Sequence, residues 1–325
     1  MRDDQDVWYP QRTMGSSVRG KTIAITGAGR GIGLATALEL SRAGARIIII
    51  EIDAASAKTG VISVEERGGQ AVSCVLDVSD AEMVERTVAT LVEQQGPVDI
   101  LINNAGIMCL GNFLDLSSKE NHRQIQVNLH GVINLMRAFL PSMERRNSGH
   151  IVNIASLAGK FGVPYSAIYS ATKHAVVGLT EAVRAEYLDS NIQFTYVLPS
   201  VVDTELFDGV TAPKWPPKVT PQDVAKAVHS AIKNGDVDVF VPRIARLSMV
   251  LDLVLPRFAQ DKLRTVLKVS NMFKNVNSAA RAEYRLRSMF SPAANDLGGT
   301  VDSDGADKAE QIDETAEVSP ASVIS

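Results

Sequence analysis

Residues 22–33 read TIAITGAGRGIG and decide the fold. The first five form a short apolar run that predicts a buried strand, and a helix-like run over 31–43 follows directly. Gly27, Gly31 and Gly33 lie at the junction, where a side chain would keep a pyrophosphate away from the backbone, and the N–H groups that begin a helix attract phosphate. A strand, a glycine turn and a helix in this order predict a dinucleotide site.

The same alternation of strand-like and helix-like runs continues along the chain. It predicts a Rossmann-like, doubly wound α/β fold, with about seven parallel strands and helices on both faces of the sheet. The predicted strands cover 22–26, 47–50, 71–76, 100–102, 151–154, 193–198 and 237–241. The predicted helices cover 31–43, 54–67, 81–94, 120–146 and 169–188, and the proline-containing stretch 209–220 suits a loop that covers the substrate.

Composition divides the chain into four parts. We expect a mobile N-terminal arm (1–19), one Rossmann-type catalytic domain (20–243), a basic amphipathic helical extension (244–290) that Pro256 kinks or divides, and an acidic disordered tail (291–325). Residues 243–290 hold ten Lys or Arg against three acidic residues. One hypothesis for this pattern is peripheral contact with an anionic membrane surface. The alternative is a pair of helices that cover the core or form a subunit interface.

The overall composition excludes several classes of protein. The 325 residues carry a net charge of -4, which gives no reason to expect nucleic-acid binding. The two cysteines, Cys74 and Cys109, are too few for a disulfide framework or a zinc cluster, so we expect a reducing, cytoplasmic location and no metal. No apolar run approaches the roughly 18 residues that a membrane-spanning helix needs.

Acidic residues near the second and third predicted strands bear on the coenzyme. Glu51 ends the second strand, where its carboxylate would accept hydrogen bonds from the ribose hydroxyls and repel a 2′-phosphate, which favours NAD over NADP. Arg30 argues the other way, because a guanidinium could pair with that phosphate. Asp53 is interpreted as a helix cap. Asp77 has two readings: a partner of the adenine amino group, or a cap for the next helix.

Two residues on one helix predict acid/base chemistry. Tyr169 and Lys173 are four residues apart and therefore share a helix face, whereas His174 points elsewhere and is interpreted as structural. A free phenol has a pKa of about 10. A neighbouring ammonium and a positively charged nicotinamide would lower that pKa and make the phenol a usable base. Ser156 ends the fifth strand, where its hydroxyl could hold a substrate oxygen, although it could also simply end the strand.

Seven motifs in order resemble the short-chain dehydrogenase/reductase family: TGAGRGIG, Asp77, NNAG at 103–106, VNLHG around Asn128, Ser156, YSATK at 169–173, and residues 199–204. Ser200 stands where the family usually has glycine. The resemblance implies a tetrad of Asn128, Ser156, Tyr169 and Lys173. In it the tyrosine is the acid/base, the serine stabilises the substrate oxygen, the lysine binds the nicotinamide ribose, and the asparagine supports a water relay.

The glycine turn, the acidic residues and the resemblance together give a set of coenzyme-binding residues. The resemblance places Thr204 on the nicotinamide carboxamide. Asn103 belongs to the NNAG turn that would face the coenzyme, but it has a second interpretation as a residue that stabilises the sheet. Asn128 likewise could be an ordinary buried amide. The predicted set is Gly27, Arg30, Gly31, Ile32, Gly33, Glu51, Asp77, Val78, Asn104, Ala105, Gly106, Tyr169, Lys173, Pro199, Val202 and Thr204.

Apolar residues at the expected pocket border favour a hydrophobic alcohol or ketone of the steroid, retinoid or fatty-chain type. The border includes Met108, Phe161, Val163, Leu206, Phe207 and Trp215. One alternative is an NADPH-dependent 3-oxoacyl-thioester reductase, and another is a regulator that senses NAD without turnover. The family resemblance also implies a homo-oligomer, by analogy alone.

Overall fold

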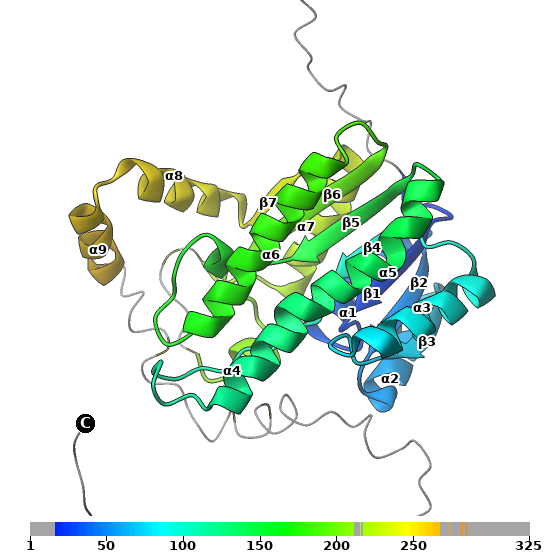
Figure 1. The fold of residues 1–325 in the computed structure, drawn as a ribbon, viewed down its shortest axis with the longest axis horizontal. Helices are drawn as coiled ribbons and strands as arrows, with labels where there is room; N and C mark the ends of the chain where they lie inside the picture. Colours follow the sequence, from blue (N-terminus) through cyan, green and yellow to red (C-terminus); the bar gives the residue numbers. More distant parts are fainter. Residues whose placement is uncertain are drawn as a thin grey trace, which may run out of the picture.

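Seven parallel strands form one twisted sheet in the order β3-β2-β1-β4-β5-β6-β7 (Figure 1). The computed structural model describes residues 17–210, 215, 217–266, 273, 281 and 284. The expected arm and tail therefore lie outside the described residues, except for residues 17–19 of the arm. The strands are β1 (Thr22–Thr26), β2 (Arg46–Glu51), β3 (Gln70–Val75), β4 (Ile100–Asn103), β5 (Gly149–Ile154), β6 (Ile192–Pro199) and β7 (Asp238–Val241).

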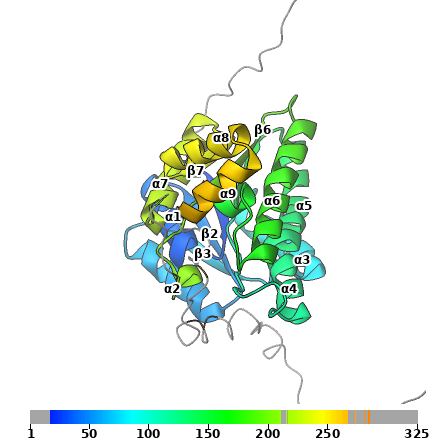
Figure 2. The same cartoon turned by 90° about the vertical axis from the view of Figure 1, so that its left-hand side faces the viewer.

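Helices cover both faces of the sheet, which confirms the doubly wound fold (Figure 2). One face is covered by α1 (Gly31–Arg42), α2 (Ala54–Glu65) and α7 (Pro221–Asn234). The other is covered by α3 (Ala81–Gln95), α4 (Ser118–Ile125), α5 (Gly131–Arg145) and α6 (Ala167–Glu186). The inner strands β4 and β5 are therefore almost wholly buried, whereas the edge strand β3 is largely exposed.

Strand β2 shows how the sequence specifies this layering. Its run of four isoleucines is fully buried, and successive side chains point to opposite faces. Ile48 and Ile50 pack with the core beneath α3, α5 and α6, whereas Ile47 and Ile49 pack with the core beneath α1, α2 and α7. An alternating polar pattern at this position would bury polar groups without partners, so an unbroken apolar run is what the fold requires.

The predicted helix over 120–146 is divided by a π-helical turn at Gln126–His130. Helix α4 begins at a capping box in which Ser117 and Glu120 exchange hydrogen bonds, and α5 begins directly after the turn. Gly131 packs so closely on Val78 that a Cβ there would lie 2.7 Å from the valine Cγ2. Asn128 lies inside the π turn, which is a common device for directing a side chain into a functional site.

Up to residue 266, the described part of the extension after β7 contains the α-helices α8 (Arg246–Val254) and α9 (Arg257–Val266), with Pro256 between them as predicted. Both lie beyond the β7 edge of the sheet (Figure 1). Among the described residues, no helix is long and apolar enough to cross a membrane.

Candidate active site

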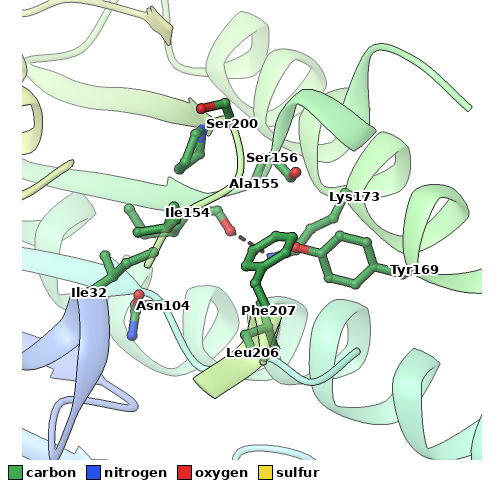
Figure 3. A pocket seen from close by; sticks show the side chains of 13 residues that line it. Ile32, Asn104, Ile154, Ala155, Ser156, Tyr169, Lys173, Ser200, Leu206 and Phe207 are labelled. Atoms are coloured by element: carbon green, nitrogen blue, oxygen red, sulfur yellow. Dashed lines mark hydrogen bonds between the residues drawn. The ribbon is translucent and has the colours of Figure 1, made fainter. Parts of the chain in front are cut away.

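A pocket opens at the carboxyl ends of the central strands, where ligands bind in open α/β sheets (Figure 3). It brings together Ser156, Tyr169 and Lys173 from the predicted tetrad and several predicted coenzyme residues. Its lining is Ile32, Asn104, Gly106, Ile154, Ala155, Ser156, Tyr169, Lys173, Pro199, Ser200, Val202, Leu206 and Phe207.

The glycine turn between β1 and α1 has the geometry that a dinucleotide needs. Gly27 and Gly31 have φ values of 62° and 55°, a region that favours glycine. A Cβ on Gly33 would collide with the carbonyl oxygen of Gly27 and lie 2.7 Å from Nδ2 of Asn104. The turn thus depends on glycine to leave its N–H groups open to a pyrophosphate, and the residues present fit the coenzyme.

Asn104 and Thr26 fix this turn against the end of β4. Nδ2 of Asn104 donates to the carbonyl oxygens of Thr26 at 2.9 Å and Gly27 at 3.1 Å. The Thr26 hydroxyl accepts from the backbone N–H groups of Asn104 at 2.9 Å and Ala105 at 3.0 Å. This role of Thr26 could not be predicted from the sequence, in which it is simply the last residue of a predicted strand.

Glu51 lies at the end of β2 and is buried, with 6% of its surface exposed. Its carboxylate accepts from the N–H groups of Gly29 at 3.2 Å and Ile52 at 3.0 Å, so it holds the glycine turn as well as facing it. Arg30 lies 3.4 Å from the carboxylate of Glu205 in an exposed pair. Asp53 caps α2 by accepting from the N–H of Ser56 at 2.7 Å, which confirms its interpretation as a cap.

Asp77 is not a helix cap, so that reading is wrong. Asp80 caps α3, because its carboxylate accepts from the N–H of Met83 at 2.9 Å. Asp77 instead accepts from the Ser79 hydroxyl at 2.6 Å and from Nη2 of Arg123 at 3.1 Å. Burial raises the pKa of Asp77, but the hydrogen bonds from Ser79 and the charge of Arg123 outweigh it and leave the pKa below its usual value.

The neighbouring predicted residues Asn103 and Val78 have structural partners. Nδ2 of Asn103 donates to Oδ1 of Asn153 on β5 at 2.8 Å, which supports its reading as a residue that stabilises the sheet. The carbonyl oxygen of Val78 accepts from Nδ2 of Asn134 at 3.0 Å.

Asn128 is fully buried, and both the oxygen and the nitrogen of its side-chain amide hydrogen-bond to the backbone of one loop residue. Its Oδ1 accepts from the N–H of Ile107, and its Nδ2 donates to the carbonyl oxygen of Ile107, both at 2.8 Å. Nδ2 also lies 3.3 Å from the hydroxyl of Thr172, beside Lys173. These contacts place Asn128 near Lys173, another member of the predicted tetrad, and support the loop after β4.

Lys173 and Tyr169 share the buried face of α6. Nζ of Lys173 donates to the carbonyl oxygen of Ile154 at 2.8 Å and lies 5.7 Å from the centre of the Tyr169 ring. In Figure 3 the phenol oxygen of Tyr169 is turned toward the inside of the pocket. Ser156 accepts from the N–H of Ala158 at 3.1 Å, and its side chain also hydrogen-bonds to Tyr169.

Burial controls the pKa values of both groups in the protein alone. It raises the pKa of Tyr169 to about 12, against a smaller lowering by the hydrogen bond with Ser156. It lowers the pKa of Lys173 to about 8. The expected lowering of the phenol pKa is therefore not present in the protein alone. The free-energy cost of removing a phenolate from water exceeds the stabilisation that its neighbours provide. A positive charge brought in by a bound coenzyme would act in the opposite direction.

The segment after β6 supplies the remaining predicted coenzyme residues. Pro199 and Val202 line the pocket, and Thr204 lies beside Gly31, whose added Cβ would approach the threonine Cγ2 to 3.4 Å. Ser200, which replaces the usual glycine, donates from its hydroxyl to the carbonyl oxygen of Pro217 at 2.9 Å.

Apolar side chains surround the substrate side of Tyr169. Leu206 and Phe207 line the pocket, and Met108 and Val163 belong to the same cluster. Trp215 is directed elsewhere, since its indole N–H donates to the hydroxyl of Ser248 on α8 at 3.3 Å. Phe161 does not line the described pocket.

Three residues from the far end of the chain contribute to the site without having been predicted from the sequence. Phe273 packs in the cluster that contains Tyr169, and Arg281 and Tyr284 contact the loop after β4. In the sequence Arg281 is one of ten basic residues in a charged segment, so nothing distinguishes it from a surface cation.

Known proteins show the same architecture and sequence pattern. The pattern of the short chain dehydrogenase family matches residues 21–215. The chain belongs to the short-chain dehydrogenase/reductase family. It is 36% identical over 233 residues to the ketoacyl reductase HetN of Nostoc sp., covering 70% of this chain and 80% of that protein. It is 30% identical over 284 residues to 17-beta-hydroxysteroid dehydrogenase 13 of Rattus norvegicus, covering 86% and 91%.

Solved structures of this family bind either nicotinamide coenzyme. A Burkholderia phymatum short-chain dehydrogenase/reductase in complex with NAD superposes with a TM-score of 0.68 at 26% identity, covering 77% of this chain and 96% of that one. A metagenomic short-chain oxidoreductase in complex with NADP gives a TM-score of 0.60 at 29% identity, covering 69% and 96%. The dehydrogenase is therefore an NAD(P)-dependent oxidoreductase that acts on CH–OH groups.

Proposed function

We propose that this dehydrogenase interconverts a lipophilic alcohol and its carbonyl compound, with Tyr169 as the acid/base. The observation that carries the proposal is the meeting of Tyr169, Ser156 and Lys173 in one pocket with the glycine turn's neighbours Ile32 and Asn104. The coenzyme, when bound, accepts or supplies the hydride. In oxidation Tyr169 takes the hydroxyl proton of the substrate, and in reduction it returns a proton to the carbonyl oxygen.

The other members of the tetrad have separate roles in this proposal. Ser156 donates a hydrogen bond to the substrate oxygen. Lys173 holds the ribose of the coenzyme and, as a cation beside the phenol, favours the phenolate. Asn128 supports the backbone of Ile107 and, through it, the wall of the pocket, which is where a water relay would begin.

We propose NAD as the preferred coenzyme. Glu51 is buried at the end of β2, beside the glycine turn, so a 2′-phosphate there would face a carboxylate whose charge water does not screen. Arg30, the residue that could favour NADP, is 3.4 Å from Glu205. Binding a 2′-phosphate would require this arginine to exchange one acidic partner for another.

The apolar cluster around Tyr169 supports a lipophilic substrate. Side chains of Leu206 and Phe207 line the pocket, and Met108 and Val163 belong to the same apolar cluster. The name of the Rattus norvegicus relative is consistent with a steroid-like alcohol. The name of the Nostoc relative keeps the alternative of a 3-oxoacyl-thioester reductase.

A panel of substrates tests this proposal. The full chain would be assayed with NAD and NADP against secondary alcohols of increasing chain length, and with NADH and NADPH against a 3-oxoacyl thioester. We expect NAD-dependent oxidation whose kcat/KM rises with apolar size. Turnover of short polar alcohols alone would refute the lipophilic substrate, and NADPH-dependent thioester reduction alone would favour the reductase. Coenzyme binding without any turnover would indicate an NAD-sensing regulator.

We further propose that α8 and α9 contact an anionic membrane surface. Four of their large apolar side chains are between 47% and 76% exposed, namely Leu247, Val250, Val254 and Phe258. Arg246, Arg257 and Lys262 lie on the same two helices. Apolar and basic side chains together are typical of helices that lie in a membrane interface. A second copy of the chain is the alternative occupant, consistent with the homo-oligomer that the family resemblance implies.

A further inference from the structure

Side chains from other parts of the fold hold the loop after β4. Three successive N–H groups of this loop donate to side-chain oxygens: Ile107 to Asn128 at 2.8 Å, Met108 to the hydroxyl of Tyr284 at 2.9 Å, and Cys109 to Gln124 at 3.0 Å. Two of these acceptors come from the α4 region, and the third comes from the far end of the chain. The position of the loop thus depends partly on Tyr284.

Arg281 connects that loop to the turn after β6. Its Nη2 donates to the carbonyl oxygen of Met108 at 2.7 Å. Its Nη1 donates to the carbonyl oxygens of Leu206 at 2.9 Å and Asp208 at 3.3 Å. Only 7% of the Arg281 surface is exposed. The planar, forked guanidinium can reach carbonyl groups on two segments at once, which a lysine ammonium on its single stem does less well.

The two segments that Arg281 joins form different walls of the pocket. The first carries Asn104 and Gly106, which line it near the glycine turn, and the second carries Leu206 and Phe207. Phe273, with 6% of its surface exposed, packs in the cluster that includes Tyr169. Residues far along the chain thus contact the pocket's walls and its apolar cluster together.

Arg281 and Tyr284 also support each other. The guanidinium carbon of Arg281 lies 4.8 Å from the centre of the Tyr284 ring, within the range of a cation–π contact. The Tyr284 hydroxyl accepts from the N–H of Met108, and Arg281 donates to the carbonyl oxygen of Met108. Both backbone polar groups of this loop residue are therefore hydrogen-bonded. A buried cation with these partners is suited to positioning backbone.

We propose that Arg281 is a positioning residue that sets the distance between the two walls of the substrate pocket, with Tyr284 fixing one wall and Phe273 closing the apolar side. These residues would therefore select substrates by size and apolar character. The inference rests on the proposed function of the pocket and extends it to the C-terminal segment. It predicts a loss of discrimination when Arg281 is replaced, while the coenzyme site is left intact.

Steady-state kinetics of Arg281→Met, Arg281→Lys and Tyr284→Phe test the proposal against Arg86→Met, a matched change at an exposed arginine on α3. For Arg281→Met we expect kcat/KM for a long-chain secondary alcohol to fall about tenfold more than that for 2-butanol, mainly through KM, with coenzyme Kd within about twofold of wild type. Arg281→Lys should keep only part of the wild-type ratio of kcat/KM for the long-chain alcohol to kcat/KM for 2-butanol. If kcat/KM falls by the same factor for both alcohols, or for neither, the ratio is unchanged and the proposal is overturned.

Hydrogen exchange provides a readout that does not depend on turnover. In Arg281→Met we expect amides in both 107–111 and 205–210 to exchange about tenfold faster, and in Tyr284→Phe only those in 107–111. Unchanged exchange in both segments of Arg281→Met would overturn the proposal. Faster exchange in a protein whose wild type oxidises no alcohol would instead count against the proposed function alone.

Discussion

The ammonium group of Lys173 donates to the carbonyl oxygen of Ile154 at 2.8 Å, and this contact joins α6 to the end of β5. Ser156 follows two residues after the end of β5, where it begins a short 3-10 turn, and Tyr169 lies one helical turn before Lys173 on α6. A single buried hydrogen bond therefore helps to fix the relative positions of the serine, the tyrosine and the lysine.

Replacing Lys173 by Met should change the pH dependence of alcohol oxidation. The reaction needs the phenolate of Tyr169, so kcat/KM rises with pH through an apparent pKa. Loss of the nearby positive charge removes a factor that favours the phenolate, and the apparent pKa should move upward while activity near pH 7 falls by about 100-fold or more. The measurement is kcat/KM against pH in both proteins. Equal apparent pKa values would show that Lys173 does not tune Tyr169.

Replacing Glu51 by Ala should weaken the preference for NAD. The substitution removes the charge that would oppose a 2′-phosphate, so the ratio of kcat/KM for NAD to that for NADP should fall by about tenfold. Asp53→Asn is the matched control, because Asp53 caps α2 and asparagine caps helices equally well. An unchanged ratio in Glu51→Ala, or an equal change in the control, would show that another residue selects the coenzyme.

His150 should make the dehydrogenase less stable in acid. The side chain is 3% exposed, its Nε2 lies 2.8 Å from the Thr195 hydroxyl, and burial lowers its pKa to about 4. Since the unfolded chain binds this proton near pH 6.5, stability present at pH 7 is lost as the pH falls toward 4. Between pH 7 and pH 5 the free energy of unfolding should drop by about 2 kcal/mol through this group.

Urea unfolding at the two pH values measures this effect. The drop should be smaller by about that amount in His150→Gln, whose amide carries no charge at either pH. His122→Gln, at an exposed position on α4, is the control and should keep the wild-type pH dependence. If His150→Gln and wild type lose the same free energy, the imidazole is not the source of the acid sensitivity.

Leu247→Ser combined with Phe258→Ser should weaken binding to phosphatidylserine vesicles about tenfold or more, because apolar insertion provides much of the interfacial affinity. Leu188→Ser is the control, because it removes a leucine of similar exposure outside α8 and α9. Leu188 is 42% exposed and Leu247 is 53% exposed. Point substitutions are preferable to truncation after 243, since Phe273 packs in the cluster that contains Tyr169 and Arg281 binds the loop after β4. Failure of wild type to co-sediment would exclude the membrane, and a change in oligomer mass in the double variant would favour a subunit interface.

Much of the fold follows from local sequence, because each buried strand of a doubly wound sheet must be apolar on both faces. The isoleucine run of β2 and the glycine turn after β1 are examples, and their boundaries agree with the structure to within a residue or two. The π turn at Asn128 could not be predicted, since apolar periodicity does not distinguish a π turn from continuing α-helix. The role of Arg281 could not be predicted either, because it depends on contacts across 173 positions of sequence.

The most direct test of the account is the comparison of Tyr169→Phe with wild type, using coenzyme-binding affinity and single-turnover hydride transfer on the same alcohol. Phenylalanine keeps the ring in place and removes only the hydroxyl that exchanges the proton. We predict coenzyme Kd within about twofold of wild type and hydride transfer slower by about 100-fold to 10,000-fold. Hydride transfer at the wild-type rate in Tyr169→Phe would contradict the central claim.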